Sequence, residues 1–395
     1  MAKNQIKLCS KQDCTGCFAC EGSCFKKAIS KAVDSEGFYY PVINHDVCVS
    51  CRACEKVCPV INPVTKKKSG EVYAAWTRDI KVRKQSSSGG MFSVFAEKIL
   101  AEGGAVVGAV MGDDDYVRHT IITSVDALHQ QRGSKYVQSM LSGDLYCDMR
   151  TLLQNGRKVL FTGTPCQVAG MKNYFKMYED ILYTIDLVCH GVPSPDFFAD
   201  FMKKLRKELP NLIKYNFRDF ENWLVCTNVN VNVNGVIVNR YLYGDYTLYQ
   251  DAFLKGYLHR ENCYHCQYSS RERISDITLA DFWGIGRVTP IQEDVSAGCS
   301  MVSVNSDKGR SLLESVKDQI YSEPRDIQES IDGGNDQIVA PSKRPSERDS
   351  FYKDAYTLEY PKLIKKYKLE LREDPSKLVV KVKNKFRRIW SKLFL

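Results

Sequence analysis

The sequence predicts an α+β fold made of a small cysteine-rich N-terminal domain, a mixed α/β body and a basic helical tail. Nine of the 16 cysteines lie before residue 60. Strand-like and helix-like segments alternate after residue 71, as in layered α/β domains. From residue 342 the composition becomes charged and irregular. We expect domains at 1–64, 71–340 and 341–395, because the polar, charged stretch 65–70 is typical of a connector.

Composition and charge narrow the class of protein. The chain has 395 residues and is 44 % hydrophobic, which is ordinary for a globular protein with two or three domains. Its first residues lack the apolar core of a signal peptide, and no stretch approaches the roughly 18 apolar residues of a membrane-spanning helix. The net charge of +9 is concentrated toward the C-terminus and comes with no basic-aromatic motif. We therefore expect no nucleic-acid partner.

The cysteines of the N-terminal domain form two runs of the same spacing, C-x2-C-x2-C-x3-C. The first run holds Cys14, Cys17, Cys20 and Cys24, and the second holds Cys48, Cys51, Cys54 and Cys58. In bacterial two-cluster ferredoxins the fourth cysteine of each run ligates the other 4Fe–4S cluster. We expect cluster one on Cys14, Cys17, Cys20 and Cys58, and cluster two on Cys48, Cys51, Cys54 and Cys24. Since thiolates bound to iron must stay reduced, a cytoplasmic location follows.

Zinc is the main alternative for these cysteines. A zinc site usually combines two C-x2-C units around one tetrahedral ion, which does not explain two complete four-cysteine runs. Phe25 stands where the first run would usually carry proline, but every ligand position is kept. Cys9 falls outside both runs, so we expect an ordinary residue there. A short strand at 37–43 is expected to cover the clusters.

The body begins with a strand, a small-residue loop, a helix and a second strand. These elements are expected at 72–76, 86–90, 91–100 and 105–111. The loop reads Ser-Ser-Ser-Gly-Gly, and free N–H groups at a helix start favour an anionic phosphate. A serine-rich N-cap without any ligand is the competing interpretation.

Two further predicted strands are each followed by a cysteine at the carboxyl end, where open α/β sheets bind ligands. Strands at 158–161 and 181–188 lead to Cys166 and Cys189, with a helix at 168–175 between them. Cys263 and Cys266 form a separate C-x2-C pair, which supplies only two ligands. The pair is half a zinc site, a redox pair, or half of a third cluster completed by Cys166 and Cys189. A buried strand-end cysteine acting only as a small apolar residue is the simpler interpretation.

The later part of the body is predicted to contain a hairpin, a helix and a strand. Segments 223–233 and 236–242 alternate around Asn234-Gly235, which is typical of a type I′ hairpin. We expect this two-stranded arm to be structural. A helix is expected at 246–255 and a strand at 275–284.

Several of these motifs occur together in one known family. In chain order they are the cysteine runs, the Ser-Ser-Gly-Gly loop, Gly163-Thr164-Pro165-Cys166-Gln167, Cys189-His190-Gly191-Val192-Pro193, Cys263-Tyr264-His265-Cys266, and Ser275-Asp276-Ile277-Thr278 through Trp283-Gly284. Over residues 10–305 the chain resembles the family of coenzyme F-420 hydrogenase/dehydrogenase beta subunits.

The resemblance implies FAD in the body and a 4Fe–4S cluster beside it. The implied flavin-site residues are Ser87, Ser88, Gly89, Gly90, Thr162, Gly163, Thr164 and Pro165. Cluster three would lie on Cys166, Cys189, Cys263 and Cys266. His190 would be either a proton donor near the flavin or a histidine that only supports the fold. Asp276 and Asp281 fall in an aspartate-rich segment of the family, without an assignable role.

The implied function is a flavin and iron–sulfur oxidoreductase acting on a small organic or deazaflavin substrate. Bacterial relatives with a fused ferredoxin domain are often associated with polysaccharide synthesis, so a sugar-linked substrate is also open. A second hypothesis is an electron-transfer subunit without a substrate site, which feeds a redox partner protein or ferredoxin. A third is an assembly factor of a glycan pathway in which the clusters are only structural.

The C-terminal tail has the pattern of an amphipathic basic helix. Asp374-Pro375 is a good helix start, and Val379, Val382, Phe386, Ile389, Trp390 and Leu393 recur at helical spacing among lysines and arginines. Such a helix lies either on the inner face of an anionic membrane as a peripheral contact, or against the body or a partner.

Overall fold

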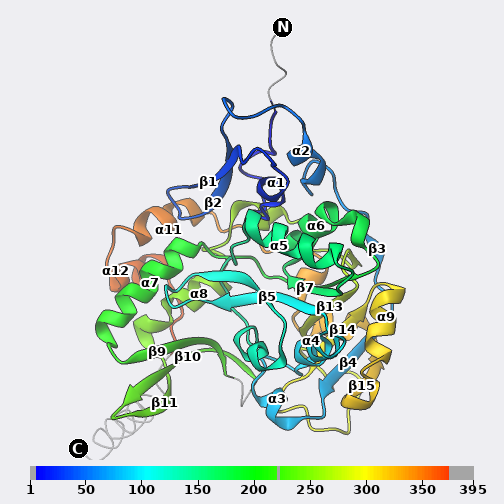
Figure 1. Cartoon of the computed structure of the whole chain (residues 1–395). Coiled ribbons are helices and arrows are strands. Elements are labelled where there is room, and N and C mark those ends of the chain that lie inside the picture. The colour runs from blue at the N-terminus through cyan, green and yellow to red at the C-terminus, as the bar shows by residue number, and fades with distance from the viewer. Residues whose placement is uncertain (1–5, 220–222, 373–395) are drawn as a thin grey trace, which may run out of the picture.

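The computed structural model describes residues 6–219 and 223–372. Its N-terminal module holds the strands β1 (Ile29–Val33) and β2 (Tyr39–Ile43), which pair antiparallel, and the short helices α1 (Ala19–Gly22) and α2 (Ala53–Val57) (Figure 1). Phe18 and Arg52 occupy the same position in the two cysteine runs, and both have left-handed backbone, with φ of 54° and 60°. The two cysteine loops therefore start their helices in the same way, which is the pseudo-symmetry expected of a two-cluster ferredoxin.

The body is built on a mixed eight-stranded sheet in the described residues. Its order is β15-β4-β14-β13-β8-β7-β5-β6. The strands are β4 (Val72–Thr77), β5 (Ala105–Met111), β6 (Val117–Ile122), β7 (Val159–Gly163), β8 (Leu182–Leu187), β13 (Ile277–Asp281), β14 (Ser300–Val304) and β15 (Ile320–Arg325). The central neighbours β5, β7, β8 and β13 are parallel. Their carboxyl ends consequently open at one edge of the sheet, which is where Cys166 and Cys189 follow.

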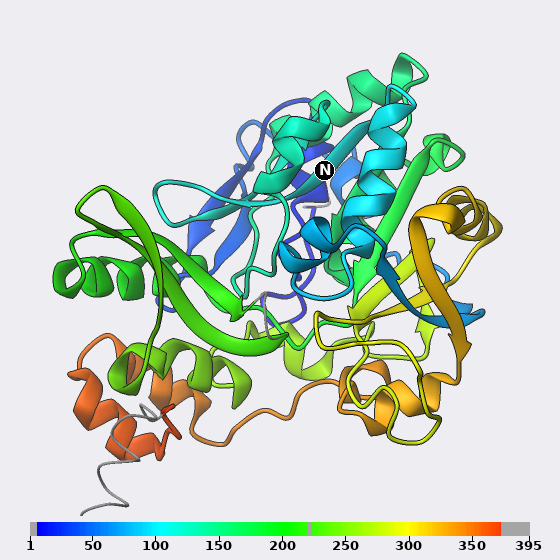
Figure 2. The same ribbon diagram turned by 90° about the horizontal axis from the view of Figure 1, so that it is seen from below.

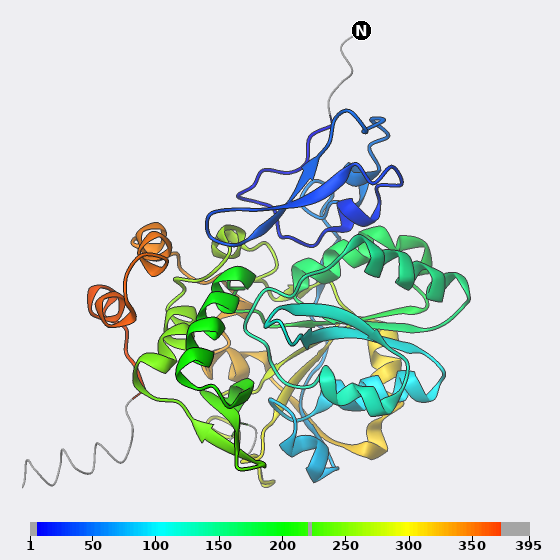
Figure 3. The ribbon, with the colours of Figure 1, turned by 60° about the vertical axis from the view of Figure 1, so that its left-hand side comes forward.

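Helices cover the sheet and carry the N-terminal module. The main ones are α3 (Ile80–Lys84), α4 (Met91–Ala101), α5 (Gly143–Gln154), α6 (Pro165–Tyr174) and α9 (Asp307–Glu314). The N-terminal module rests on α5 and α6 (Figure 3). The hydroxyl of Tyr146 on α5 donates to the carbonyl oxygen of Cys17 at 2.8 Å, and that of Tyr174 on α6 donates to Gly22 at 3.0 Å. The ferredoxin-like module is thereby fixed to the body by buried contacts.

Helix α6 starts three residues before the predicted position. Pro165 takes the first helical position, and the Gln167 side chain accepts a hydrogen bond from the Thr164 N–H at 3.0 Å. A capping box with proline at the first turn fixes a helix start, and this signal outweighs the apolar periodicity that begins at Val168. Cys166 therefore lies in the first turn of a helix instead of in a loop.

The predicted two-stranded arm is a three-stranded sheet. Strands β10 (Leu224–Val233) and β11 (Val236–Tyr241) form the expected hairpin, with positive φ at both Asn234 and Gly235. Strand β9 (Leu212–Asp219) pairs with the inner side of β10 and was not expected. The three strands curve away from the body beside the C-terminal helices (Figure 2).

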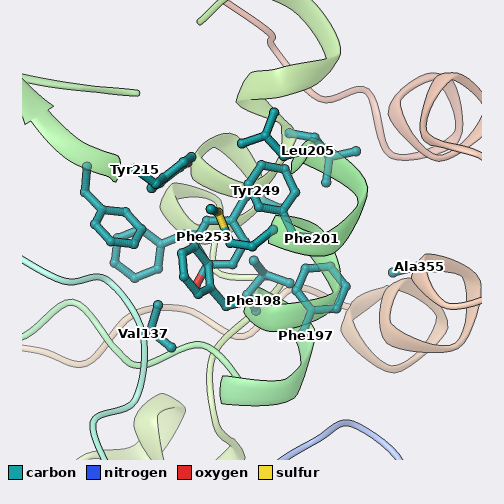
Figure 4. Close-up of a cluster of buried hydrophobic side chains, with 14 of the residues drawn as sticks. Val137, Phe197, Phe198, Phe201, Leu205, Tyr215, Tyr249, Phe253 and Ala355 are labelled. Carbon is teal, nitrogen blue, oxygen red and sulfur yellow. The ribbon is translucent and has the colours of Figure 1, made fainter. Parts of the chain in front are cut away.

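An aromatic core supports this smaller sheet. Helices α7 (Pro195–Glu208) and α8 (Leu248–Leu254) contribute Phe197, Phe198, Phe201, Tyr249 and Phe253, which pack with Tyr215 of β9 (Figure 4). Edge-to-face pairs such as Phe198–Tyr249, with ring centroids 5.0 Å apart, add stability beyond the buried area. This core forms one wall behind the cavity described below.

The last described part of the chain, up to Arg372, packs beside this core. Helices α10 (Ile327–Asp332), α11 (Arg348–Ala355) and α12 (Tyr360–Tyr367) follow the body, and β3 (Lys67–Lys68) pairs with β12 (Glu272–Arg273). The predicted amphipathic helix behind Asp374 lies outside the described residues. Within those residues, no helix has the length and apolar character needed to cross a membrane.

Candidate functional site

The four thiols predicted for cluster one come together from two loops. Burial raises the pKa of Cys17 to about 12, and the nearby Cys14 and Cys58 thiols raise it further. Burial also raises the pKa of Cys20, as do Cys17, Cys14 and Cys58. Cys58 belongs to the second run, so its place near Cys17 and Cys20 is the one that the predicted cross-ligation needs.

Cys9 adjoins this group, although its position in the sequence gave no such indication. Its thiol hydrogen-bonds to Cys14 and Cys58, and these bonds lower the pKa of Cys14 to about 6 and that of Cys58 to about 7. Hydrogen bonding to a thiolate favours its charged form. Cys9 is therefore a close neighbour of two predicted ligands.

The four thiols predicted for cluster two line one small pocket at the tip of the module. Cys24, Cys48, Cys51 and Cys54 share it with apolar side chains such as Ile6, Ile29 and Ile43. Cys51 is exposed, whereas Cys54 is buried. Lys26 and Arg52 also line the pocket, and no acidic residue does among the described residues. This second group thus faces the outside, while the first faces the body.

The four thiols predicted for cluster three also converge, from three separate elements. Cys166 lies in α6, Cys189 follows β8, and the other two lie in and just after the 3-10 turn Glu261–His265. Burial raises the pKa of Cys263, and Cys189, Cys266 and Cys166 raise it further. Burial raises the pKa of Cys166 and of Cys189 to about 12, and Cys266 acts in the same direction on both. The sequence spacing alone could not decide that these two pairs meet.

The spacing of the thiols differs from that of a zinc site. Zinc binds four ligands directly, with each sulfur about 2.3 Å from the ion. Among the described residues, no group of three or more His, Cys, Asp or Glu side chains is arranged to hold one metal ion. A 4Fe–4S core is larger and takes one thiolate on each iron, so its four ligands lie farther apart than those of a zinc ion.

Helix α6 and Tyr268 connect the groups of clusters one and three. Cys166 lies in the first turn of α6, and Gly170 one turn later contacts Cys17. Burial raises the pKa of Tyr268, and the thiols Cys166, Cys17, Cys266 and Cys58 raise it further. The Tyr268 hydroxyl consequently lies among thiols of both groups. One helical turn, about 5.4 Å, separates the two points of contact along α6.

A large cavity opens at the carboxyl ends of the parallel strands, beside Cys189 of the group predicted for cluster three. Its volume is about 520 Å³, within the range of cofactor and ligand sites. The predicted flavin-site residues that line it are Ser87, Ser88, Gly90, Thr162, Gly163 and Thr164. Gly89 and Pro165 are not among its lining residues. Cys189 and His190 do line it, so the cavity reaches the thiols of cluster three.

The cavity wall contains polar atoms that lack a protein partner. The Oγ1 of Thr162 and the Oε1 of Gln131 are buried and make no hydrogen bond within the described residues. A buried polar atom without a partner is costly, so a ligand with complementary groups is expected there. This observation supports a polar cofactor in the cavity.

Behind Thr162, a neutral histidine fixes the strand end. Burial lowers the pKa of His119 to about 4, so the ring is uncharged at neutral pH. Its Nε2 donates to the carbonyl oxygen of Thr162 at 2.9 Å, which leaves Nδ1 to accept from the Ser139 hydroxyl at 2.6 Å. His119 and Ser139 both line the cavity and were not found by sequence reasoning.

An ion pair at the opposite wall holds the serine-rich loop. Arg218 and Asp281 pair at 2.6 Å, and the guanidinium also donates to the carbonyl oxygen of Ser87 at 2.8 Å. The indole N–H of Trp223 donates to Asp281 at 2.6 Å. Asp281 therefore supports the loop through Arg218. Asp276 is different, because it accepts from the Thr184 N–H and hydroxyl between two strands.

His190 lies in the cavity wall close to a second histidine. Its Nε2 donates to the carbonyl oxygen of Leu254 at 3.1 Å, which leaves Nδ1 as the acceptor nitrogen. The ring of the fully buried His259 lies 5.1 Å away, centroid to centroid. The arrangement suits either role that the sequence left open for His190.

The body matches both parts of one family. Residues 72–145 match the N-terminal region, and residues 156–330 the C-terminal region, of the coenzyme F420 hydrogenase/dehydrogenase beta subunit. The chain belongs to this family of beta subunits. Residues 13–62 match a 4Fe-4S dicluster domain, so the family body carries an iron–sulfur domain fused to its N-terminus. The family is one of oxidoreductase subunits with iron–sulfur clusters.

One curated protein and one solved chain are similar to part of this beta subunit. An F(420)H(2) dehydrogenase subunit of Methanosarcina mazei is 24 % identical over 216 residues, which are 52 % of this chain. The match spans 60 % of the length of that relative. A solved chain of the F420-reducing [NiFe] hydrogenase complex from Methanosarcina barkeri is 17 % identical, with a TM-score of 0.44. The alignment covers 65 % of this chain and 83 % of that chain.

Proposed function

We propose that the protein is an iron–sulfur flavoprotein oxidoreductase that passes electrons between 4Fe–4S clusters and FAD. The observation that carries this proposal is the position of Cys189. It belongs to the group of four body cysteines and also lines the cavity that holds Ser87, Ser88 and Thr162. A cluster on these thiols would therefore border a cofactor in the cavity.

The residues around the cavity suit a flavin nucleotide. The start of α4 is free of acidic side chains in its first turn, so its N–H groups and dipole favour a phosphate beside Ser88 and Gly90. The orphaned atoms of Thr162 and Gln131 can each bind a polar ring edge. Bound FAD would accept electrons in pairs and release them singly, which 4Fe–4S clusters can carry.

The three cysteine groups stand in a defined order between the surface and the cavity. The thiols proposed for cluster two are outermost, Cys17 of those for cluster one lies against α6, and Cys189 of those for cluster three borders the cavity. The exposed Cys51 lies beside Lys26, Arg52 and the 68 % exposed Phe25. We infer that an acidic redox partner protein such as a ferredoxin exchanges electrons at this tip.

The substrate would bind at the cavity mouth as a small organic molecule or a deazaflavin. The name of the Methanosarcina mazei relative favours coenzyme F420, and a sugar-linked compound of polysaccharide synthesis is a further substrate class. His190 Nδ1 is positioned to hold or accept a proton at the cavity wall.

The proposal is tested by purifying the whole chain without oxygen and measuring its cofactors. We expect FAD and about twelve irons, four for each of three clusters. Eight irons without flavin would contradict the flavoprotein proposal. Anaerobic bleaching of the flavin by reduced coenzyme F420, NADH or reduced ferredoxin then identifies the donor.

An electron-transfer subunit without a substrate site is the second candidate. The Methanosarcina mazei relative is named as one subunit of a dehydrogenase, which favours a role beside partner chains. Flavin bleaching by reduced ferredoxin alone, with no response to either small donor, would favour this second function.

A further inference from the structure

Arg260 is a buried cation at the junction of the N-terminal module and the body. Its side chain is 0 % exposed. Nε donates to the carbonyl oxygen of Cys14 at 2.7 Å, Nη1 to the Oε1 of Gln138 at 3.0 Å, and Nη2 to the carbonyl oxygen of Tyr39 at 3.1 Å. The guanidinium lies 3.9 Å from the ring centroid of Tyr40. All these partners are neutral.

Three other buried arginines have carboxylate partners, whereas the buried Arg83 has only backbone carbonyl partners. Pairs are formed by Arg218 with Asp281, Arg273 with Asp186, and Arg348 with Glu36. In the described part of the chain, no carboxylate oxygen lies within 4.0 Å of the Arg260 guanidinium nitrogens. A buried charge is retained at heavy cost unless an opposite charge is near. An anion beside Arg260 would therefore stabilise its charge, and the protein carboxylates do not supply one there.

The contacts of Arg260 reach cysteine loops of two different groups. Its Nε donates to the carbonyl oxygen of Cys14 at 2.7 Å, and its own carbonyl oxygen accepts from the Cys263 N–H at 2.9 Å. Cys14 belongs to the group predicted for cluster one and Cys263 to the group predicted for cluster three. A 4Fe–4S core on four thiolates is an anion, and its negative charge increases when it is reduced.

We propose that Arg260 is the shared counter-cation of clusters one and three and that it raises the reduction potential of both. The proposal rests on the three clusters of the proposed function. A fixed positive charge stabilises the reduced, more negative cluster over the oxidised one, because Coulomb interactions are strong where water is excluded. Arg260 thus acts only through its charge: it favours the reduced state of the cluster on each side of the junction and does not itself react.

The surroundings of Arg260 hold the guanidinium at this point. Gly16 has φ of +69°, and a Cβ there would lie 2.5 Å from the Nε2 of Gln138 and 3.1 Å from the Nη1 of Arg260. The backbone N–H of Arg260 donates to Val192 at 2.9 Å, and its carbonyl oxygen accepts from the Cys263 N–H at 2.9 Å. One residue consequently joins the cysteine loops of both clusters.

The test is a redox titration of the complete chain, followed by electron paramagnetic resonance. The signal of cluster three is assigned by its loss in Cys263→Ser. For Arg260→Gln we expect the oxidised-to-reduced ratio of clusters one and three at a fixed potential to rise at least tenfold, which is about 59 mV for a one-electron couple. Cluster two should keep its potential, and Arg260→Lys should retain most of the effect. Arg348→Lys is the matched control, since it alters a buried arginine whose partner is Glu36.

A second variant keeps the test decisive if Arg260→Gln does not fold. Gln138→Glu changes one atom next to Arg260 and supplies the missing carboxylate, so both potentials should fall in the same direction. Unchanged potentials in Gln138→Glu and in every folded Arg260 variant would overturn the proposal, as would an equal shift of all three clusters. Fewer than about twelve irons in the unmodified chain would instead contradict the proposed function.

Discussion

Gly170 of α6 lies directly against Cys17 of the N-terminal module, so that an added Cβ would be 2.9 Å from the cysteine Sγ. Cys166 lies one turn earlier in the same helix. The absence of a side chain at Gly170 therefore allows the thiols of clusters one and three to approach the same helix. In protein structures a Cβ atom essentially never lies within 3.0 Å of a heavy atom of a non-neighbouring residue, so a side chain at position 170 would displace Cys17 or the helix.

Gly170→Ala is expected to destabilise the protein. Alanine in a helix interior is usually about 1 kcal/mol more favourable than glycine, but here the methyl group meets a buried cluster ligand. We predict a lower thermal unfolding temperature and an altered spectrum of cluster one. Gly143→Ala on α5 is the control, because its Cβ would come no closer than 3.3 Å to the Glu21 side chain and 3.6 Å to the backbone of the N-terminal module. A raised unfolding temperature with an unchanged spectrum would show that the module does not rest on α6.

Cys263→Ser should remove one cluster and spare the other two. Serine is a poor ligand for iron, so iron content should fall by about four atoms per chain while the signals of the N-terminal clusters persist. Iron analysis and electron paramagnetic resonance measure this. Cys147→Ser, at an exposed position outside the three groups, should leave the iron unchanged. Equal iron in both variants would refute cluster three.

Thr162→Val should weaken flavin binding. The change removes the orphaned Oγ1 in the cavity wall while keeping the shape of the side chain. Loss of one hydrogen bond to FAD costs about 1 kcal/mol, or roughly fivefold in the dissociation constant. Thr120→Val is the matched control, since its Oγ1 also lacks a partner in the described part of the chain but lies outside the cavity lining. Fluorescence titration of the flavin-free protein should separate the two variants, and equal affinities would count against a flavin contact at Thr162.

Acidification should destabilise the protein through His119. Its pKa is about 4 in the folded state against about 6.5 in an unfolded chain, so the unfolded state binds the extra proton between these values. Stability is therefore fully present above pH 6.5 and falls as the pH is lowered toward 4, by up to about 3 kcal/mol. Denaturant unfolding at several pH values should show a shallower dependence in His119→Gln. Replacement of the exposed His45 by glutamine should preserve the slope, and an equal slope in both variants would exclude His119 as the cause.

Much of the fold was predictable from local patterns. The strands at Val72–Thr77 and Ala105–Met111, the helix at Met91–Ala101 and the turn at Asn234-Gly235 all follow apolar period or turn chemistry. The start of α6 and the strand Leu212–Asp219 were missed. In α6 the capping residues outweigh periodicity, and β9 is stabilised by its pairing with β10, which leaves no separate local signal.

Some cavity residues could also be predicted from a local sequence signal, and others could not. Ser87, Ser88, Gly90 and Thr162 were predicted because they belong to small-residue motifs at element boundaries. His119 was not predicted, since a lone histidine in a strand is ordinary in sequence and gains its role only from Thr162 and Ser139 across the sheet.

The sequence by itself determined the two four-cysteine runs and the cross-ligation that their spacing implies, because cluster ligands of one loop must be close along the chain. Only the tertiary structure decided that Cys166, Cys189, Cys263 and Cys266 converge, that Cys9 adjoins Cys14 and Cys58, and that Arg260 lies between two groups of thiols. Cys166 and Cys189 follow parallel strands that end at one edge of the sheet, and the segment with Arg260, Cys263 and Cys266 packs against them from far along the chain. Charges interact through space and burial depends on packing, so which groups lie near one another is decided only when the chain folds.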